Sequence, residues 1–247
     1  MLTVRYSSNH AISPTTPDTP DVLYGDRNNV DLSLARLLPP CAPTKIVCVG
    51  RNYPEHAKEL GNEVPAEPLI FMKPPSSLIA HGDSIVYPSL SQRVDFEGEL
   101  GVIIGRRARH VKREQAFDYV LGYTIVNDIT ARDLQRKDGQ WTRGKGFDTF
   151  CAVGPAMAAQ ADLDPAKLRV VTTLDGVVKQ DGLVSEMMFP VDAIISYVSQ
   201  FMTLEPGDLI ATGTPPGVGP MQAGSVIQVE IEGIGILRNT VVREVLN

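Results

Sequence analysis

The sequence has few cysteines, few aromatic residues and no long apolar run. Its cysteines, Cys41, Cys48 and Cys151, show no Cys-x-x-Cys spacing, which argues against a zinc site or a redox motif. An odd, scattered set of cysteines is typical of a reducing compartment. Neither a signal peptide nor the roughly 18–20 consecutive apolar residues of a membrane-spanning helix can be found. We therefore predict a cytoplasmic protein without a membrane partner.

Positive charge is also scarce. Lys and Arg total 23 and Asp and Glu total 29, so the net charge is −6. An acidic protein repels the phosphates of nucleic acids, and no nucleic-acid partner is predicted. A small anionic substrate remains possible, but it would need local cations or a metal ion to bind.

Several catalytic motifs are missing. The sequence has no Gly-x-Ser-x-Gly motif, and the Gly/Pro-rich loop at residues 212–219 lacks the Gly-Lys-Ser/Thr of a phosphate loop. No cysteine has a convincing catalytic partner. Covalent catalysis therefore has no good candidate residue.

What is present predicts a mainly β protein of the α+β class. The 21 glycines and 19 prolines are typical of many turns and short strands, and Asp175-Gly176 between two apolar runs predicts a tight hairpin. Residues 191–202 form the one convincing amphipathic helix. Residues 1–43 are rich in Ser, Thr, Pro, Asp and Asn and are predicted as a small N-terminal β appendage, with residues 44–247 as the main catalytic domain.

The most informative segment is Asp95–Gly105, predicted as one strand. Because side chains alternate along a strand, Glu97 and Glu99 point to the same face. Two carboxylates near a core must protonate, find cations or bind a metal, and oxygen ligands suit Mg²⁺, Mn²⁺ or Ca²⁺. Asp128, at the end of an apolar strand, is a third candidate ligand. The alternatives are a solvated strand face for the glutamates and an N-cap of a helix near Thr130 for Asp128.

A candidate general base lies in the short helix predicted at residues 54–60. His56 and Glu59 are spaced i, i+3 and share one helix face, so the carboxylate can orient the imidazole. An ordinary charged surface helix is the alternative. Lys145 stands between two glycines in a polar loop at residues 138–148, where it either binds a substrate carboxylate or belongs to a mobile surface loop. Thr214 lies in a loop that could hold an oxyanion or be a plain turn.

Six segments in one order resemble the fumarylacetoacetate hydrolase family, over roughly residues 44–245. No single motif is decisive, but six in the same order are highly specific. They are VGRNY at residues 49–53 followed by His56 and Glu59, FMKP at 71–74, DFEGEL at 95–100, NDITARDLQ at 127–135, WTRGKGFD at 141–148 and TGTP at 212–215.

The resemblance implies rolled, mixed β-sheets with a few short helices, assembled as a homodimer. It implies Mg²⁺ or Mn²⁺ held by Glu97, Glu99 and Asp128. It further implies that His56 and Glu59 form a water-activating dyad, that Lys145 contacts the substrate, and that other substrate contacts come from three positions, Arg51, Gln135 and Thr214.

Among the short members of the family, the resemblance implies an acylpyruvate hydrolase. Such an enzyme cleaves a C–C bond in a 2,4-dioxo acid to give pyruvate and a carboxylic acid. The alternatives are an oxaloacetate decarboxylase and a 2-hydroxyhepta-2,4-diene-1,7-dioate isomerase or decarboxylase. Residues 1–43 are too short for the N-terminal domain of the true fumarylacetoacetate hydrolases, so that substrate is not expected. Rival classes are a metabolite-binding module without activity and a lyase of sugar acids.

Overall fold

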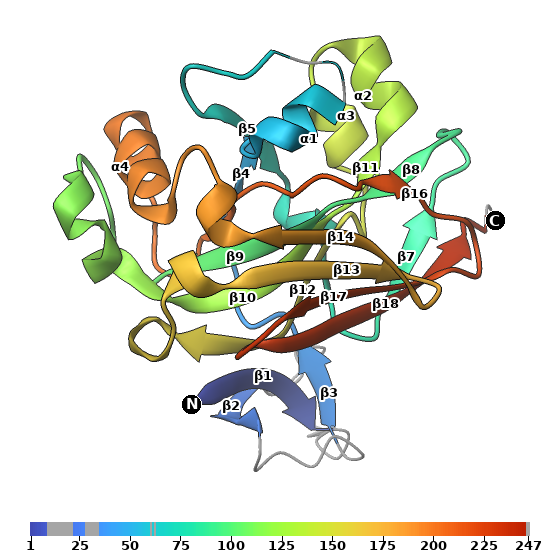
Figure 1. Ribbon diagram of the computed structural model, residues 1–247. Coiled ribbons are helices and arrows are strands. Elements are labelled where there is room, and N and C mark those ends of the chain that lie inside the picture. Colours follow the sequence, from blue (N-terminus) through green and yellow to red (C-terminus); the bar gives the residue numbers. More distant parts are fainter. Residues whose placement is uncertain (9–21, 28–34, 60, 62, 246–247) are drawn as a thin grey trace.

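The structure of the protein is a computed structural model, in which residues 1–8, 22–27, 35–59, 61 and 63–245 are described. Within these residues the chain forms three β-sheets of ten, five and three strands, with short helices around them (Figure 1). The predicted class, mainly β with mixed sheets and few helices, is confirmed.

The largest sheet contains both parallel and antiparallel pairs. Its order is β2-β1-β12-β10-β9-β15-β4-β5, with β3 paired to β1 and β6 paired to β12. The β15–β4 and β12–β6 pairs are parallel, and the other pairs are antiparallel. The strands are β1 (Leu2–Ser8), β2 (Val22–Asp26), β3 (Ala35–Leu38), β4 (Ile46–Gly50), β5 (Leu69–Lys73), β6 (Leu78–Ala80), β9 (Gly98–Ile104), β10 (Val120–Asp128), β12 (Cys151–Ala159) and β15 (Leu209–Ala211).

A five-stranded sheet packs against this sheet. Its order is β14 (Val177–Leu183), β13 (Arg169–Leu174), β17 (Val226–Ile231), β18 (Gly235–Arg243) and β7 (Ser84–Tyr87). Leu100 and Ile125 of the larger sheet share one buried core with Val170 and Val229 of the smaller one. The predicted hairpin joins β13 to β14, and both Asp175 and Gly176 have positive φ angles, 51° and 81°, as such a two-residue turn requires.

The third sheet is small and lies on the right of Figure 1, below α2 and α3. It consists of β11 (Thr130–Ala131), β8 (Val94–Phe96) and β16 (Gly219–Pro220). Its presence corrects two predictions. The helix expected from Thr130 begins at Arg132 because Thr130 pairs with Asp95 as a strand. The expected strand Asp95–Gly105 is interrupted at Glu97, where the chain passes from the small sheet to the large one.

Side chains explain this interruption. The backbone N–H of Glu97 donates to Asn127 Oδ1 at 3.0 Å, and that of Gly98 donates to Gln180 Oε1 at 3.0 Å. Both N–H groups therefore bond to buried amide side chains instead of to a neighbouring strand. Glu97 therefore sits at the junction between two sheets, with Glu99 two residues further along β9.

The helices are short and occupy two places. Figure 1 shows α1, α2 and α3 together in the upper part of the molecule, beside β4 and β5, and α4 apart from them on the left. Buried Val191, Ile194, Ile195 and Val198 give α4 the apolar face predicted from its sequence. The α-helices are α1 (Pro54–Glu59), α2 (Arg132–Asp138), α3 (Thr142–Lys145) and α4 (Val191–Phe201), and the 3₁₀ helices are Pro75–Ser77, Arg113–Tyr119, Gln160–Asp162, Pro165–Lys167 and Val184–Glu186. No helix in the described segments is long and apolar enough to cross a membrane.

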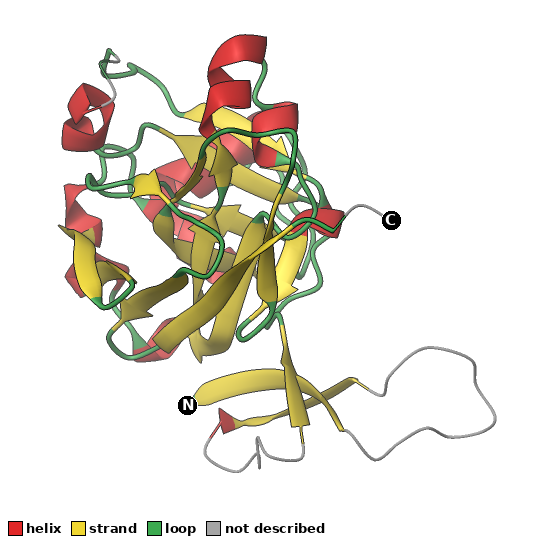
Figure 2. Cartoon of the chain, turned by 90° about the vertical axis from the view of Figure 1, so that its right-hand side faces the viewer, coloured by secondary structure: helices red, strands yellow, loops and turns green. Residues whose placement is uncertain are grey.

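The N-terminal strands extend away from the main body (Figure 2). Val4 and Leu37 of these strands form a small core with Ala156 of β12, and β1 also pairs with β12 and so joins the main sheet. Residues 9–21 and 28–34 of the predicted appendage lie outside the described residues. The division between residues 1–43 and 44–247 stays a prediction.

Candidate metal centre and active-site pocket

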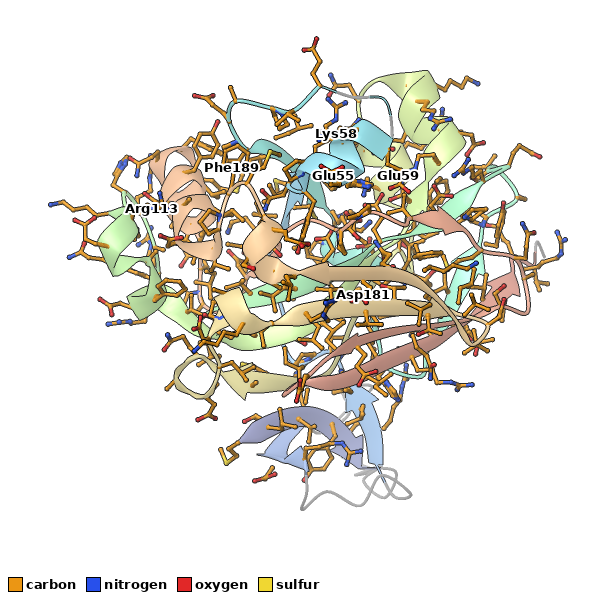
Figure 3. All side chains as sticks on the ribbon, viewed as in Figure 1. Glu55, Lys58, Glu59, Arg113, Asp181 and Phe189 are labelled. Carbon is orange, nitrogen blue, oxygen red and sulfur yellow. The ribbon has the colours of Figure 1, made fainter. Side chains whose placement is uncertain are left out.

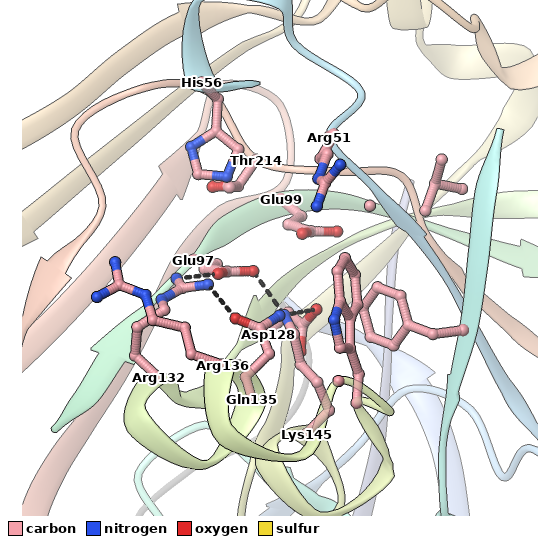
Figure 4. A pocket seen from close by; sticks show the side chains of 15 residues that line it. Arg51, His56, Glu97, Glu99, Asp128, Arg132, Gln135, Arg136, Lys145 and Thr214 are labelled. Carbon is pink, nitrogen blue, oxygen red and sulfur yellow. Dashed lines mark hydrogen bonds and ion pairs between the residues drawn. The ribbon is translucent and has the colours of Figure 1, made fainter. Parts of the chain in front are cut away.

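A cavity of about 300 Å³ opens beside α1 and α2 (Figure 4). It brings together every predicted site residue except Glu59, although they come from distant segments of the chain. The lining residues are Val49, Gly50, Arg51, His56, Phe71, Glu97, Glu99, Asp128, Arg132, Gln135, Arg136, Gly139, Trp141, Lys145 and Thr214.

Three acids converge in this cavity. One carboxylate oxygen each from Glu97, Glu99 and Asp128 lies within 4.8 Å of the others, and all three residues are buried. Strand pairing produces this arrangement, because β10 runs antiparallel to β9 and the Asp128 N–H donates to the Glu97 carbonyl at 2.8 Å. The helix-cap alternative for Asp128 is not observed, since α2 begins four residues later.

The electrostatics of the acids favour a cation. Burial, and then the charges of Asp128 and Glu97, raise the pKa of Glu99 well above its usual range. Burial alone would also raise the pKa of Glu97, but Lys145 and Arg132 outweigh it and hold that pKa low. Three converging carboxylates offer the oxygen ligands that Mg²⁺ and Mn²⁺ prefer. The residues therefore fit a divalent metal ion.

Lys145 already places a positive charge among the acids. Its Nζ donates to Glu97 Oε2 and to Asp128 Oδ2, each at 2.7 Å (Figure 4). Lys145 is buried and lies on α3, so the mobile-loop alternative is wrong for this residue. The physical reason is close packing of α3 on α2. A Cβ atom at Gly144 would lie only 2.8 Å from the backbone N of Gln135.

Two further buried cations were not identified from the sequence as site residues. Lys73, which is fully buried, donates to Asp128 Oδ1 at 2.6 Å and to the Ile129 carbonyl at 3.0 Å. Arg132 donates to Asp95, Glu97 and Gln135. Both residues fall in the segments that carry the family resemblance. Their burial could not be predicted, because their partners include acids far away in the sequence.

The two residues of the predicted dyad are in contact. His56 Nδ1 lies 3.3 Å from Glu59 Oε2, and the buried imidazole lines the cavity. Burial lowers the pKa of His56, although Glu97 and Glu59 act in the opposite direction. When Nδ1 donates to Glu59, Nε2 of the neutral ring is free to accept a proton. Glu59 also accepts a hydrogen bond from Gly217 N at 3.1 Å.

The outer face of α1 has a different character. Glu55 and Lys58 pair with each other at 2.7 Å and are well exposed, as Figure 3 shows. The surface-helix alternative is therefore correct for these two residues but not for His56. The same short helix presents charged groups to water on one side and a buried imidazole to the cavity on the other.

The predicted substrate-contact residues differ in the contacts that their side chains already make within the protein. Thr214 Oγ1 donates to the Gly98 carbonyl at 2.8 Å and accepts from Gln180 Nε2 at 2.7 Å, so its hydroxyl is already engaged. Gln135 Oε1 accepts from Arg132. Arg51 has a left-handed backbone, with φ of 55°, and its guanidinium lies 6.0 Å from the centre of the Trp141 ring.

Comparison with known proteins gives consistent matches. Residues 45–242 match the family described as fumarylacetoacetate (FAA) hydrolase C-terminal. The chain is 40% identical to the mitochondrial oxaloacetate tautomerase FAHD2A of Homo sapiens, over 94% of this chain and 82% of that protein.

Two crystal structures have similar folds over their full length. One is 2-hydroxyhepta-2,4-diene-1,7-dioate isomerase from Mycobacterium marinum, with a TM-score of 0.85, 40% identity and 99% of both chains covered. The other is 5-carboxymethyl-2-hydroxymuconate delta-isomerase from Mycobacterium smegmatis, with a TM-score of 0.86, 40% identity and 100% of both chains covered.

Proposed function

Because the chain belongs to the fumarylacetoacetate hydrolase family, whose members are enzymes, we propose that it is a metal-dependent tautomerase or isomerase of small 2-oxo acids. One observation carries this proposal: a buried, neutral His56 shares a cavity with the acids Glu97, Glu99 and Asp128. A base beside a site for a 2-oxo acid head group is what proton transfer at carbon 3 requires. The names of the similar proteins agree with this chemistry.

The three acids would hold Mg²⁺ or Mn²⁺. Such an ion, when bound, polarises a 2-oxo group and favours negative charge on its oxygen. His56 Nε2 accepts the proton from carbon 3, the electron pair forms the C2=C3 bond, and the 2-oxo oxygen becomes negative. Lys145 supplies positive charge on the same side of the cavity. Return of the proton to a different atom completes the tautomerisation or isomerisation.

The proposal is tested by following the interconversion of enol- and keto-oxaloacetate by ultraviolet absorbance, with Mg²⁺ and with EDTA. We expect catalysis that needs the metal ion and that is lost in Asp128→Asn. Absence of turnover of both oxaloacetate and acetylpyruvate in the presence of Mg²⁺ would instead favour a metabolite-binding module.

Hydrolysis of acylpyruvates is a second candidate, and the His56–Glu59 contact favours it. In this reaction His56 would take a proton from a water molecule that attacks the distal carbonyl. The bond between carbons 3 and 4 then breaks to give pyruvate and a carboxylic acid.

Assays with acetylpyruvate distinguish the two candidates. Decarboxylation of oxaloacetate needs no such base, so His56→Ala should spare it.

We also propose a homodimer in the cytoplasm, as the resemblance and the composition imply. Light scattering coupled to size-exclusion chromatography tests the oligomeric state, and cell fractionation tests the location. A monomer in solution would contradict the first of these proposals.

A further inference from the structure

We propose that Arg136 binds a second carboxylate of the substrate, so that the enzyme selects dicarboxylic over monocarboxylic 2-oxo acids. This inference rests on the proposed function, because it assumes that the 2-oxo acid head group lies at the three acids. It assigns a specificity role to a residue outside the predicted site.

The α2 helix directs Arg136 to the cavity. Arg132, Gln135 and Arg136 are spaced i, i+3 and i+4, so they share one face of the helix, and all three line the cavity. Arg132 and Gln135 are buried and bonded to each other, whereas Arg136 is exposed. On this face of the helix, Arg132 is bonded to Glu97, one of the three acids, and Arg136 lies closer to solvent.

Arg136 has no ion-pair partner among the described residues. The two acids of α2 are engaged elsewhere. Asp138 pairs with Arg143, and Asp133 accepts hydrogen bonds from Ser91 Oγ and from the backbone N–H of Gln92. Arg132, in contrast, is committed to Asp95 and Glu97. Arg51 also lines the cavity without an ion pair to any described residue, and its guanidinium lies 6.0 Å from the centre of the Trp141 ring. An uncommitted guanidinium beside a cavity is available to a ligand.

The arrangement of charge along the cavity suits a dianion. The acids, which would hold the metal ion, are buried, and Arg136 lies at an exposed position of the same cavity. In Figure 4, Arg136 and Arg51 come from elements on opposite sides of the acids. A substrate bound by its 2-oxo acid end at the acids would extend its other end toward the opening. A guanidinium fork can bind a carboxylate there through two hydrogen bonds.

The overall charge of the protein makes this local cation more significant. With a net charge of −6, the molecule as a whole disfavours the approach of a dianion. Positive charge at the cavity offsets this repulsion locally. A monocarboxylic 2-oxo acid would gain nothing from Arg136 once its head group is bound.

Calorimetric titrations in the presence of Mg²⁺ test the inference with ligands that differ only at the far end. The pairs are 2-oxoglutarate with 2-oxopentanoate and oxaloacetate with 2-oxobutyrate, and each second ligand carries a methyl group in place of the distal carboxylate. One of the two pairs will bind more tightly than the other. For that pair, we expect the wild-type protein to bind the dicarboxylate with an affinity about 10- to 100-fold higher than that for the monocarboxylate. Arg136→Gln should weaken the dicarboxylate alone and bring the ratio close to one.

Lys137→Gln is the matched control, because it removes one positive charge from an exposed position of α2 that does not line the cavity. It should leave both affinities unchanged. Two results would overturn the assignment to Arg136. In the first, Arg136→Gln weakens the binding of both ligands equally. In the second, the preference for the dicarboxylate survives Arg136→Gln and disappears in Arg51→Gln. Binding of monocarboxylates without any preference would overturn this inference alone. Binding of neither ligand would overturn the proposed function as well.

Discussion

The carboxylate of Asp128 is held in place by two lysines. Its Oδ1 accepts from Lys73 and its Oδ2 accepts from Lys145, so each oxygen has a different partner. Lys145 lines the cavity, whereas Lys73 does not. We infer that Lys73 orients Asp128, leaving Oδ2 turned toward the other acids. A buried charge of this kind is stable only while its partner is present.

Replacement of Lys73 by methionine should therefore be costly. The variant leaves Asp128 Oδ1 buried without its cation, and we expect the free energy of unfolding without metal to fall by about 3–5 kcal/mol. Urea unfolding followed by circular dichroism measures this. Lys58→Met is the control, because Lys58 belongs to an exposed pair and its loss should change little. Equal effects of the two substitutions would refute the role of Lys73.

In the proposed mechanism, the pKa of His56 sets the acid limit of activity. It lies below its ordinary value of 6.5 because the ring is buried, so the imidazole is neutral near neutral pH. A base must be unprotonated to act, and kcat/KM should fall only as the pH drops below 6.5. Glu59 raises the His56 pKa through its hydrogen bond, so Glu59→Gln should shift this limb to still lower pH. A pH–rate profile with an acid limb above 6.5 would contradict the assignment.

At the scale of elements, two parallel strands place the segments that follow them beside the site. β4 and β15 pair in parallel, and both end at the cavity, β4 before Arg51 and β15 before the loop that contains Thr214. Their other ends are joined by Asp208. Its buried carboxylate accepts from Thr44 N, Thr44 Oγ1, Lys45 N and Glu205 N. This cluster sets the register with which the two strands approach the site.

Asp208→Asn should weaken this junction by about 2 kcal/mol, because charge-assisted hydrogen bonds become neutral ones. Burial would raise the Asp208 pKa, but the hydrogen bonds from Glu205, Lys45 and Thr44 lower it overall. A lowered pKa in the folded state stabilises the protein above the unfolded pKa of about 3.9, and this stability is lost as the pH falls through the folded value. The difference between wild type and variant in urea should thus be full near neutral pH and shrink in acid. A difference that does not depend on pH would disprove the charge argument.

For the whole molecule, the acids lie where the small sheet meets the large one. Glu97 stands where the chain leaves the small sheet, Glu99 lies in β9 and Asp128 ends β10. A metal ion that binds all three would bind only the folded chain. Such a ligand stabilises the native state in proportion to the logarithm of its concentration.

We expect Mg²⁺ to raise the melting temperature and EDTA to remove the increase. Without metal, Glu99→Gln should be at least as stable as wild type, because it replaces a carboxyl whose ionised form is disfavoured first by burial and then by Asp128 and Glu97. The same variant should lose the response to Mg²⁺. Thermal denaturation with and without the ion measures both effects. A melting temperature that rises equally in wild type and variant would place the ion elsewhere.

The sequence by itself determined the fold class, the family and the short-range patterns. Strand alternation predicts Glu97 and Glu99 on one side, helical spacing predicts His56 beside Glu59, and Asp175-Gly176 predicts a hairpin, because each pattern depends only on neighbouring residues. The two carboxylates do converge, although Glu97 lies in the break between β8 and β9 rather than within a strand. The joining of Asp128 to the two glutamates was predicted as well, through the order of the motifs rather than through physical reasoning on their spacing.

Only the tertiary structure decided which charges are buried and which stay free. The break at Glu97 arises because Asn127 and Gln180, from other strands, bind consecutive backbone N–H groups. Lys73 and Lys145 are buried against Asp128, while Arg136 is left without an ion-pair partner among the described residues. Sequence spacing cannot reveal these differences, because the environment of a charged side chain is set by partners that the fold brings from distant strands.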